Sequence, residues 1–278
     1  MLECKYVNSM GEEFVFGIEN NRINKSDIRD YEWNYTEQYD KIKKFTKGLT
    51  TRSIPVHFFN RSYYMYHDEM LYKAEDLYAM TDRDVRTLNQ GKLYIGDYYT
   101  NCYIVASAKQ EYDNGVIISE TLSVLSDFKW RKNIERTFGG SSAYEPGSSD
   151  VDYPYDYMWD YVLGASQSRL VSDSVAPFDF RIDFQGPVEN PMLIVGGHIY
   201  RVYASVYQGE YLTVDSIEKT ITKTKQNGDV VNLFNYRDRE NYIFEPMPVR
   251  NGSSLVQWQE GKIVSLTAYV ERSEPKWI

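Results

Sequence analysis

Apolar and polar residues alternate along most of the N-terminal half of the chain. A period of two residues sets one face of a strand against a core and the other in water, so these runs predict β-strands. The predicted strands are residues 3–7, 14–18, 29–35, 39–46, 51–59, 92–95, 98–111 and 115–127. Lys47-Gly48 predicts a turn between two of them, and Asn114-Gly115 predicts a tight hairpin between the last two.

One segment has the periodicity of a helix instead. Its apolar residues recur every three or four positions, which places them on one stripe of a helix. They are Tyr63, Tyr66, Met70, Ala74 and Leu77. Ser62 is suited to cap the start of this helix, while Thr81 with Asp84 predicts a second cap and a separate short helical turn up to Leu88.

The helix stripe has two interpretations, and the sequence leaves both open. An amphipathic stripe usually packs against the sheet of its own domain. Tyrosine and methionine are also enriched where proteins touch one another, which favours a contact between subunits. The candidate residues for either role are Tyr63, Tyr66, Met70, Leu77 and Tyr78.

A stretch rich in glycine and serine, FGGSSAYEPGSSD at residues 138–150, interrupts the pattern near the middle of the chain. Such composition is typical of a linker. We therefore expect a first domain of residues 1–137 and a second of residues 151–278. The second half consists of strand patterns separated by turn signals with no helix, which predicts an antiparallel sandwich or jelly-roll.

One hairpin of the second half is distinctive because hydroxyl residues alternate along it. Thr220, Thr222 and Thr224 alternate with Ile and Lys, and Asn227-Gly228 forms the turn signal. Both faces of this hairpin would be partly exposed to solvent, which is typical of the edge of a sheet. We expect residues 219–234 to form an exposed outer arm.

Composition narrows the classes of function. The 278 residues carry a formal net charge of −9, which does not suit a protein that grips nucleic acid or an anionic membrane. The two cysteines, Cys4 and Cys102, cannot build a disulfide scaffold or a cysteine zinc site, and they fit synthesis in a reducing compartment. No signal peptide opens the chain, and no apolar run is long enough to insert into a membrane. Tyrosine is unusually abundant, with 26 residues.

Catalytic and cofactor motifs are missing from the sequence. The three histidines form no zinc-binding pattern, and neither a nucleophile elbow nor a phosphate-binding glycine loop occurs. We therefore expect no enzyme activity, no cofactor and no metal. The most polar tract, DVDYPYDYMWDY at residues 150–161, has several interpretations: a strand with alternating carboxylates, a calcium site, a sugar platform, or a glycosidase carboxylate pair. A strand is the leading one.

Several segments in combination resemble the distal tail proteins (Dit family) of siphophages. They are residues 91–112 (GKLYIGDYYTNCYIVASAKQEY), 153–157 (YPYDY), 177–191 (PFDFRIDFQGPVENP), 196–215, 228–235 and 271–277 (ERSEPKW). The resemblance covers nearly the whole chain in order, and ERSEPKW is its most specific part.

The resemblance implies a mainly β protein with an N-terminal belt domain of strands and one helix, followed by a C-terminal galectin-like sandwich. Belt domains of this family form a hexameric ring at the distal end of the tail in the virion, after synthesis in the host cytoplasm. The implied partners are further copies of the chain, the tail-tube protein and the tip or hub protein, with the tape-measure protein and a receptor-binding protein as further candidates. An acidic ring suits a channel that passes DNA without gripping it.

Two other functions remain open at this point. A galectin-like domain with surface aromatic residues could instead be a glycan-binding module. An enzyme would be a glycosidase that uses two of the aspartates near residues 150–160, and substitution of Asp152 and Asp156 by alanine would test that site.

Overall fold

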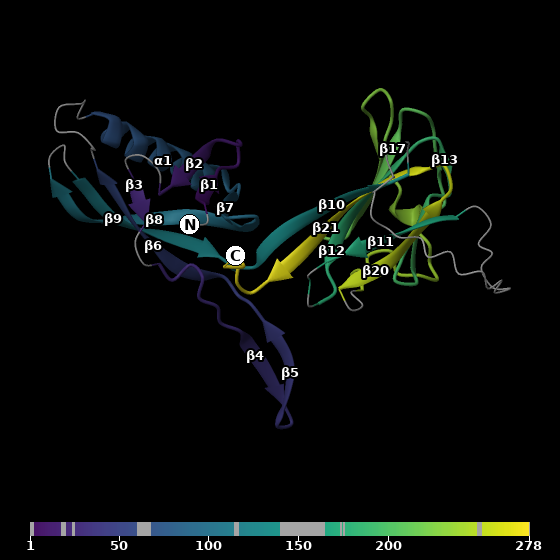
Figure 1. The fold of residues 1–278 in the computed structure, drawn as a ribbon, viewed down its shortest axis with the longest axis horizontal. Coiled ribbons are helices and arrows are strands. Elements are labelled where there is room, and N and C mark those ends of the chain that lie inside the picture. The colour runs from purple at the N-terminus through teal and green to yellow at the C-terminus, as the bar shows by residue number, and fades with distance from the viewer. Residues whose placement is uncertain are drawn as a thin grey trace, which may run out of the picture. The chain divides into compact units, whose positions relative to one another are not determined.

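The computed structural model describes residues 3–17, 21–23, 26–59, 68–113, 117–139, 165–172, 174, 176–248 and 252–277. For residues 68–70, 111–113 and 165 it describes the backbone alone. The chain forms two compact units, Met1–Lys132 with Glu271–Ile278, and Asn133–Val270 (Figure 1). Compared with the predicted division, residues 133–138 belong to the second unit and residues 271–278 to the first. The predicted linker lies outside the described residues except for Phe138 and Gly139.

The first unit is built from two sheets that share one long strand, β8. In one sheet the order is β8-β7-β1-β2, and in the other β9 lies between β8 and β6, with β3 beyond β6. The strands are β1 (Cys4–Val7), β2 (Glu13–Phe16), β3 (Asn21–Ile23), β6 (Thr50–Phe59), β7 (Gly91–Ile95), β8 (Tyr98–Asp113) and β9 (Ile117–Ser126). β8 pairs with β7 through its first five residues and with β9 from Tyr103 onward.

A single helix, α1 (Asp68–Thr87), packs against β8 and β6 of this unit. The apolar stripe of α1 packs into a hydrophobic core made of buried side chains. These include Tyr6, Phe58, Leu77, Leu93 and Trp130. The prediction of a mainly β unit with one helix is confirmed for the described residues.

The predicted helical conformation after Thr81 is confirmed up to Thr87, but the predicted second cap and separate start are wrong, because α1 runs through this segment without interruption. The Thr81 hydroxyl donates a hydrogen bond to the Tyr78 carbonyl, 3.1 Å away, within the helix. Asp84 caps nothing, since its carboxylate accepts hydrogen bonds from β1 and the turn that follows it. The helix ends where Leu88 adopts a left-handed backbone conformation with a φ of 56°.

The second unit is an antiparallel sandwich. One sheet has the strand order β19-β18-β17-β12-β21, and the other β11-β20-β14-β15. Its strands are β11 (Ala165–Val171), β12 (Asp179–Gln185), β13 (Val188–Glu189), β14 (Met192–Val195), β15 (His198–Arg201), β16 (Ser205–Val206), β17 (Tyr211–Asp215), β18 (Thr220–Thr224), β19 (Val230–Asn232), β20 (Ser253–Gln259) and β21 (Ile263–Arg272), with a short 3₁₀ helix, η1 (Phe234–Tyr236).

The core of this unit lies between its sheets. Phe180, Ile182 and Phe184 alternate along β12 and are buried, and they share one cluster with Leu193 of β14 and Trp258 of β20. β10 (Trp130–Phe138) and β21 contain residues of both units. The prediction of a C-terminal antiparallel sandwich is confirmed.

Candidate interaction surface

A hairpin of the first unit stands away from the rest of that unit. Its strands, β4 (Asn34–Gln38) and β5 (Lys41–Thr46), pair only with each other among the described strands. Every residue of β4 is exposed, as is every residue of β5 except Thr46. Figure 1 shows the hairpin leaving the unit on the side opposite α1. We call β4, β5 and their turn the arm.

The arm turns through Tyr39 and Asp40, which both have a positive φ, of 53° and 56°. Two consecutive residues in this conformation form the tight turn whose twist matches a β-hairpin. The sequence pattern predicted one continuous strand over residues 39–46 and a turn at Lys47-Gly48. That prediction is wrong, because the chain reverses direction at Tyr39 and Asp40 and β5 begins only at Lys41.

The two faces of the arm differ in chemistry. Register places Tyr35 opposite Phe45 and Glu37 opposite Ile42 on one face, with Asn34 opposite Thr46 and Thr36 opposite Lys44 on the other. The Phe45 ring lies edge-on to Tyr35 and to Trp33, each at 6.5 Å between ring centres. The arm is therefore an amphipathic ribbon with one aromatic face.

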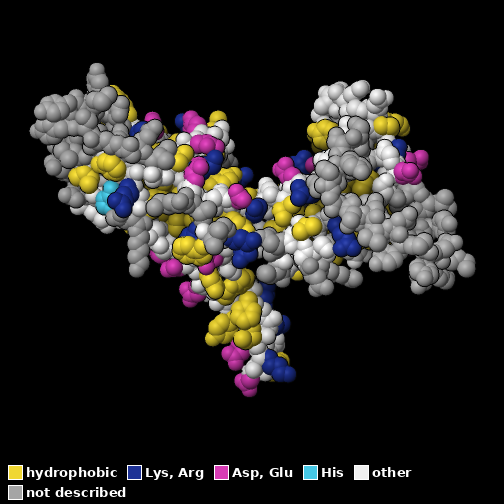
Figure 2. Space-filling model, viewed as in Figure 1, with side chains coloured by type: hydrophobic (Ala, Val, Ile, Leu, Met, Phe, Trp, Pro, Cys, Tyr) yellow, Lys and Arg dark blue, Asp and Glu magenta, His cyan; other side chains and the backbone are white. Residues whose placement is uncertain are grey.

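Most of this aromatic face lies in contact with solvent. Trp33 is 45% exposed, Tyr35 61%, Ile42 57% and Phe45 54%. Figure 2 shows hydrophobic side chains gathered along the arm. Contiguous apolar patches of this kind mark surfaces that bind another molecule. A two-stranded hairpin is also marginally stable by itself in water, so a partner that covers this face would stabilise it.

The structure places two of the five candidate residues of the helix stripe. Leu77 is completely buried in the core of the first unit, so it packs within its own chain. Tyr78 is partly buried, and its hydroxyl donates a 2.6 Å hydrogen bond to Glu120. Tyr63 and Tyr66 lie outside the described residues, and only the backbone of Met70 is described.

Tyr78 belongs to a polar cluster that stabilises the packing of α1 on the sheet. The hydroxyls of Tyr78 and Ser107 and the ammonium of Lys109 all donate to the same oxygen of Glu120, Oε2, at 2.6 Å. Burial, together with the hydrogen bond to Glu120, raises the pKa of Tyr78. All three donors bind the carboxylate of Glu120, so the cluster connects α1 to β8 and β9 and serves a structural role.

The hairpin that the sequence predicted as an outer arm, residues 219–234, lies at a sheet edge, as its alternating threonines indicated. β19 is the outermost strand, and β18 with Thr220, Thr222 and Thr224 pairs between it and β17. Asn227 and Gly228 are exposed in the connecting turn, where Gly228 has a φ of 87°. Its use as a docking arm stays a prediction.

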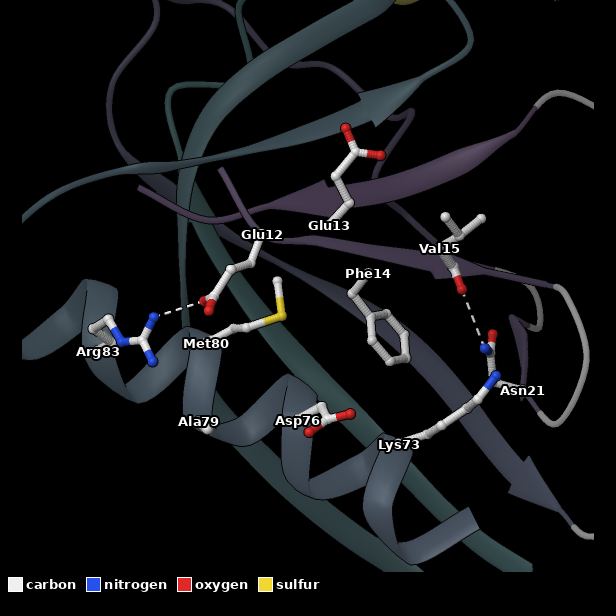
Figure 3. Close-up of a pocket in the computed structure, with 10 residues that line it drawn as sticks. All are labelled: Glu12, Glu13, Phe14, Val15, Asn21, Lys73, Asp76, Ala79, Met80 and Arg83. Atoms are coloured by element: carbon white, nitrogen blue, oxygen red, sulfur yellow. Dashed lines mark hydrogen bonds and ion pairs between the residues drawn. The ribbon is translucent and has the colours of Figure 1, made fainter. Parts of the chain in front are cut away.

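A groove of about 490 Å³ lies between β2 and α1 in the first unit. Figure 3 shows Phe14 and Met80 at its base and Lys73 and Asp76 rising from the helix. Arg83 pairs with Glu12 at 2.6 Å. No serine, cysteine or histidine is among the residues that line the groove, so these residues offer neither a serine or cysteine nucleophile nor an imidazole base.

Other chemistry is equally sparse in the described part of the chain. The described residues contain no group of three or more histidine, cysteine or acidic side chains placed to hold a metal. His57 contacts the Ser119 hydroxyl at 2.8 Å and His198 the Tyr242 carbonyl at 3.0 Å, while His67 lies outside the described residues. The tract from Asp150 to Tyr161, with Asp152 and Asp156, is also outside them. No described helix has the length and apolarity of a membrane span.

Comparison with known proteins finds likeness in structure alone. No protein-family model matches the sequence, and no curated protein matches it. Among solved structures, a chain of the phage P2 baseplate in its activated conformation with Ca has a TM-score of 0.57 at 12% identity, over 99% of this chain and 100% of that one. The corresponding structure with Sr has a TM-score of 0.55 at 13% identity, over 99% and 100%.

A further match is the Dit protein of phage SPP1, described as a paradigm of the hub adsorption apparatus in phages that infect Gram-positive bacteria. Its TM-score is 0.57 at 9% identity, over 96% of this chain and 98% of that one. The fold is therefore shared with these phage proteins from one end of the chain to the other.

Proposed function

We propose that this protein is a structural component of a phage tail tip, of the distal-tail type, and that it works by assembling into a ring rather than by catalysis. The observation that carries the proposal is an end-to-end fold shared with baseplate and Dit chains, together with an exposed aromatic arm that has no partner strand among the described residues. The family resemblance of the sequence points the same way.

The arm supplies the means of assembly. Its aromatic face binds a neighbouring copy, and a contact between two different surfaces closes into a ring when the rotation between copies permits. About half of four large side chains is exposed, so burial removes roughly 400 Å² of apolar surface and contributes on the order of 10 kcal/mol before ordering costs. By family analogy the ring has six copies.

The remaining roles follow from the same proposal. The first unit forms the ring below the tail-tube protein and above the tip or hub protein. The second unit, a galectin-like sandwich in this proposal, faces outward and presents the β18–β19 hairpin to a receptor-binding protein. The tape-measure protein is a further candidate neighbour. The protein acts in the virion, at the distal end of the tail.

The test compares one substitution on each face of the arm. Phe45→Ser removes an aromatic ring, whereas Lys44→Ser changes the polar face at the neighbouring position. Loss of about 100 Å² of buried ring surface weakens association by about 2.5 kcal/mol per contact, or roughly sixtyfold. Sedimentation velocity over a range of protein concentrations measures this effect. Equal association of the two variants would contradict the role of the arm.

A further inference from the structure

The last described residues of the chain contact the root of the arm. Residues 271–277 belong to the first unit, although β21, which leads into them, runs through the second. Figure 1 shows the C-terminus beside the segments that lead into β4 and out of β5. One polar side chain from each of those segments, Arg29 and Lys47, holds the residues of this tail.

Arg29, five residues before β4, makes three contacts with the tail. Its Nη1 donates to the Pro275 carbonyl at 3.3 Å and lies 3.6 Å from Glu274 Oε1. Its guanidinium lies 3.9 Å from the centre of the Trp277 ring, within the range of a cation–π contact. The Arg29 side chain is only 17% exposed, so these contacts are partly shielded from water.

Lys47 makes the matching contacts at the other end of the arm. Its ammonium donates to the Phe128 carbonyl at 3.1 Å and to the Ser273 carbonyl at 3.5 Å, and it lies 5.1 Å from the centre of the Trp33 ring. Burial lowers the pKa of Lys47. One side chain therefore connects the tail to the first ring of the aromatic face.

A third contact fixes the start of the tail. Arg131 Nε of β10 donates to Glu271 Oε1 at 2.8 Å, and the Arg131 side chain is mostly buried. The tail is thus held at Glu271, Ser273 and residues 274–277, and two of these three attachments involve the ends of the arm.

We infer that residues 271–277 are a brace that sets the direction of the arm, an inference that rests on the proposed function for its biological consequence. The strands of the arm pair with no other described strand, so the direction in which the arm points is controlled at its root. The brace contacts that root from both sides. Arg29 and Lys47 are positioning residues, because they act on the arm and not on its partner.

The experiment measures arm direction and association separately. Spin labels at Tyr39→Cys, on the tip, and Leu88→Cys, at the end of α1, report a distance within the first unit by pulsed electron paramagnetic resonance. Both sites are exposed, whereas Cys102 is buried and Cys4 is half-buried. The distance is measured in the full chain, in a chain that stops after Arg272, and in Arg29→Gln, with the exposed Arg22→Gln of β3 as the control.

We expect a narrow distance distribution in the full chain and in Arg22→Gln, and a broader one in the shortened chain and in Arg29→Gln. If the arm without its brace points in the direction needed for binding only a tenth of the time, its affinity for a neighbouring copy falls about tenfold. Unchanged distributions in both brace variants would overturn the inference. A broadened distribution with unchanged association would support the brace and refute the role of the arm in assembly, so the two proposals fail separately. Thermal unfolding checks that every variant is folded.

Discussion

Replacing Tyr6 with phenylalanine removes one hydroxyl from the interior of the first unit and tests how that interior is held together. Tyr6 of β1 and Asp84 of α1 are both completely buried, and the Tyr6 hydroxyl donates to Asp84 Oδ2 at 2.5 Å. The other oxygen, Oδ1, accepts from the Ser9 backbone N–H at 3.0 Å and from the Ser9 hydroxyl at 2.5 Å. This carboxylate is where the end of the helix is joined to the sheet.

The expected cost follows from this geometry. A hydrogen bond to a charged group contributes about 1.5–3 kcal/mol, and Asp84 keeps both donors of Ser9 after the substitution. We therefore expect Tyr6→Phe to lower the free energy of unfolding by about 2 kcal/mol at pH 7. The control is Tyr31→Phe, since that side chain is exposed and its change stays within about 0.5 kcal/mol.

The Tyr6 hydroxyl also makes the free energy of unfolding depend on pH in the alkaline range. Burial, followed by the hydrogen bond to Asp84, raises the pKa of Tyr6 well above its usual value of 10.0. Above that pH the unfolded chain loses the proton while the folded chain keeps it, so the contribution of Tyr6 to stability is constant well below pH 10 and falls as pH rises through 10. Between pH 9 and pH 11 this one group removes about 1.4 kcal/mol from the wild type and nothing from Tyr6→Phe.

Urea unfolding at pH 7, pH 9 and pH 11, followed by fluorescence, measures both effects. The deficit of Tyr6→Phe relative to the wild type should be about 2 kcal/mol at pH 7 and should shrink to well under 1 kcal/mol at pH 11. Tyr31→Phe should show neither change. A variant as stable as the control, or a deficit that does not depend on pH, would refute the buried pairing of Tyr6 with Asp84.

Two further predictions concern the same unit. Gly91→Ala would place a methyl group against the Tyr6 hydroxyl, so it should lower the free energy of unfolding by about 1–3 kcal/mol. In the control Gly48→Ala the added carbon lies 3.7 Å from its nearest neighbour, so this variant should be close to neutral in thermal melts. Equal melting temperatures of the two variants would contradict the prediction. Burial raises the pKa of the Cys4 thiol to about 12 and also raises the pKa of Cys102, so iodoacetamide at pH 8 should label the native protein roughly a hundredfold more slowly than the protein in urea. Similar labelling rates in the two states would show that the thiols are accessible.

Local patterns were enough to predict the sandwich of the second unit. In β12 the sequence alternates apolar and polar residues, and the structure buries Phe180, Ile182 and Phe184 as that alternation requires. The Asn227-Gly228 hairpin also lies where glycine supplies the positive φ that a tight turn needs. In both cases the cause of the structure is contained in a few neighbouring residues.

Other features depend on contacts that no short window of sequence contains. The turn of the arm has no glycine, since Tyr39 and Asp40 themselves adopt the left-handed conformation. The tail ERSEPKW has no apolar period, and its place in the first unit comes from Arg29, Lys47 and Arg131 far along the chain. The role of Asp84 as a buried acceptor similarly depends on Ser9 and Tyr6, which lie more than seventy residues away.

The arm shows why the candidate interaction surface could not be distinguished from the core by its sequence pattern. Trp33, Tyr35 and Phe45 alternate with polar residues just as the buried residues of β12 do, and the sequence gives both segments the same apolar face. In β12 that face meets a second sheet of the same unit, while in the arm it meets solvent. Apolar surface of this extent is driven out of water wherever a complementary surface is present, so under the proposed function a neighbouring copy supplies the second layer that the described residues do not. An exposed apolar face and a buried one therefore have the same alternation in sequence, and only the packing of the folded chain distinguishes them.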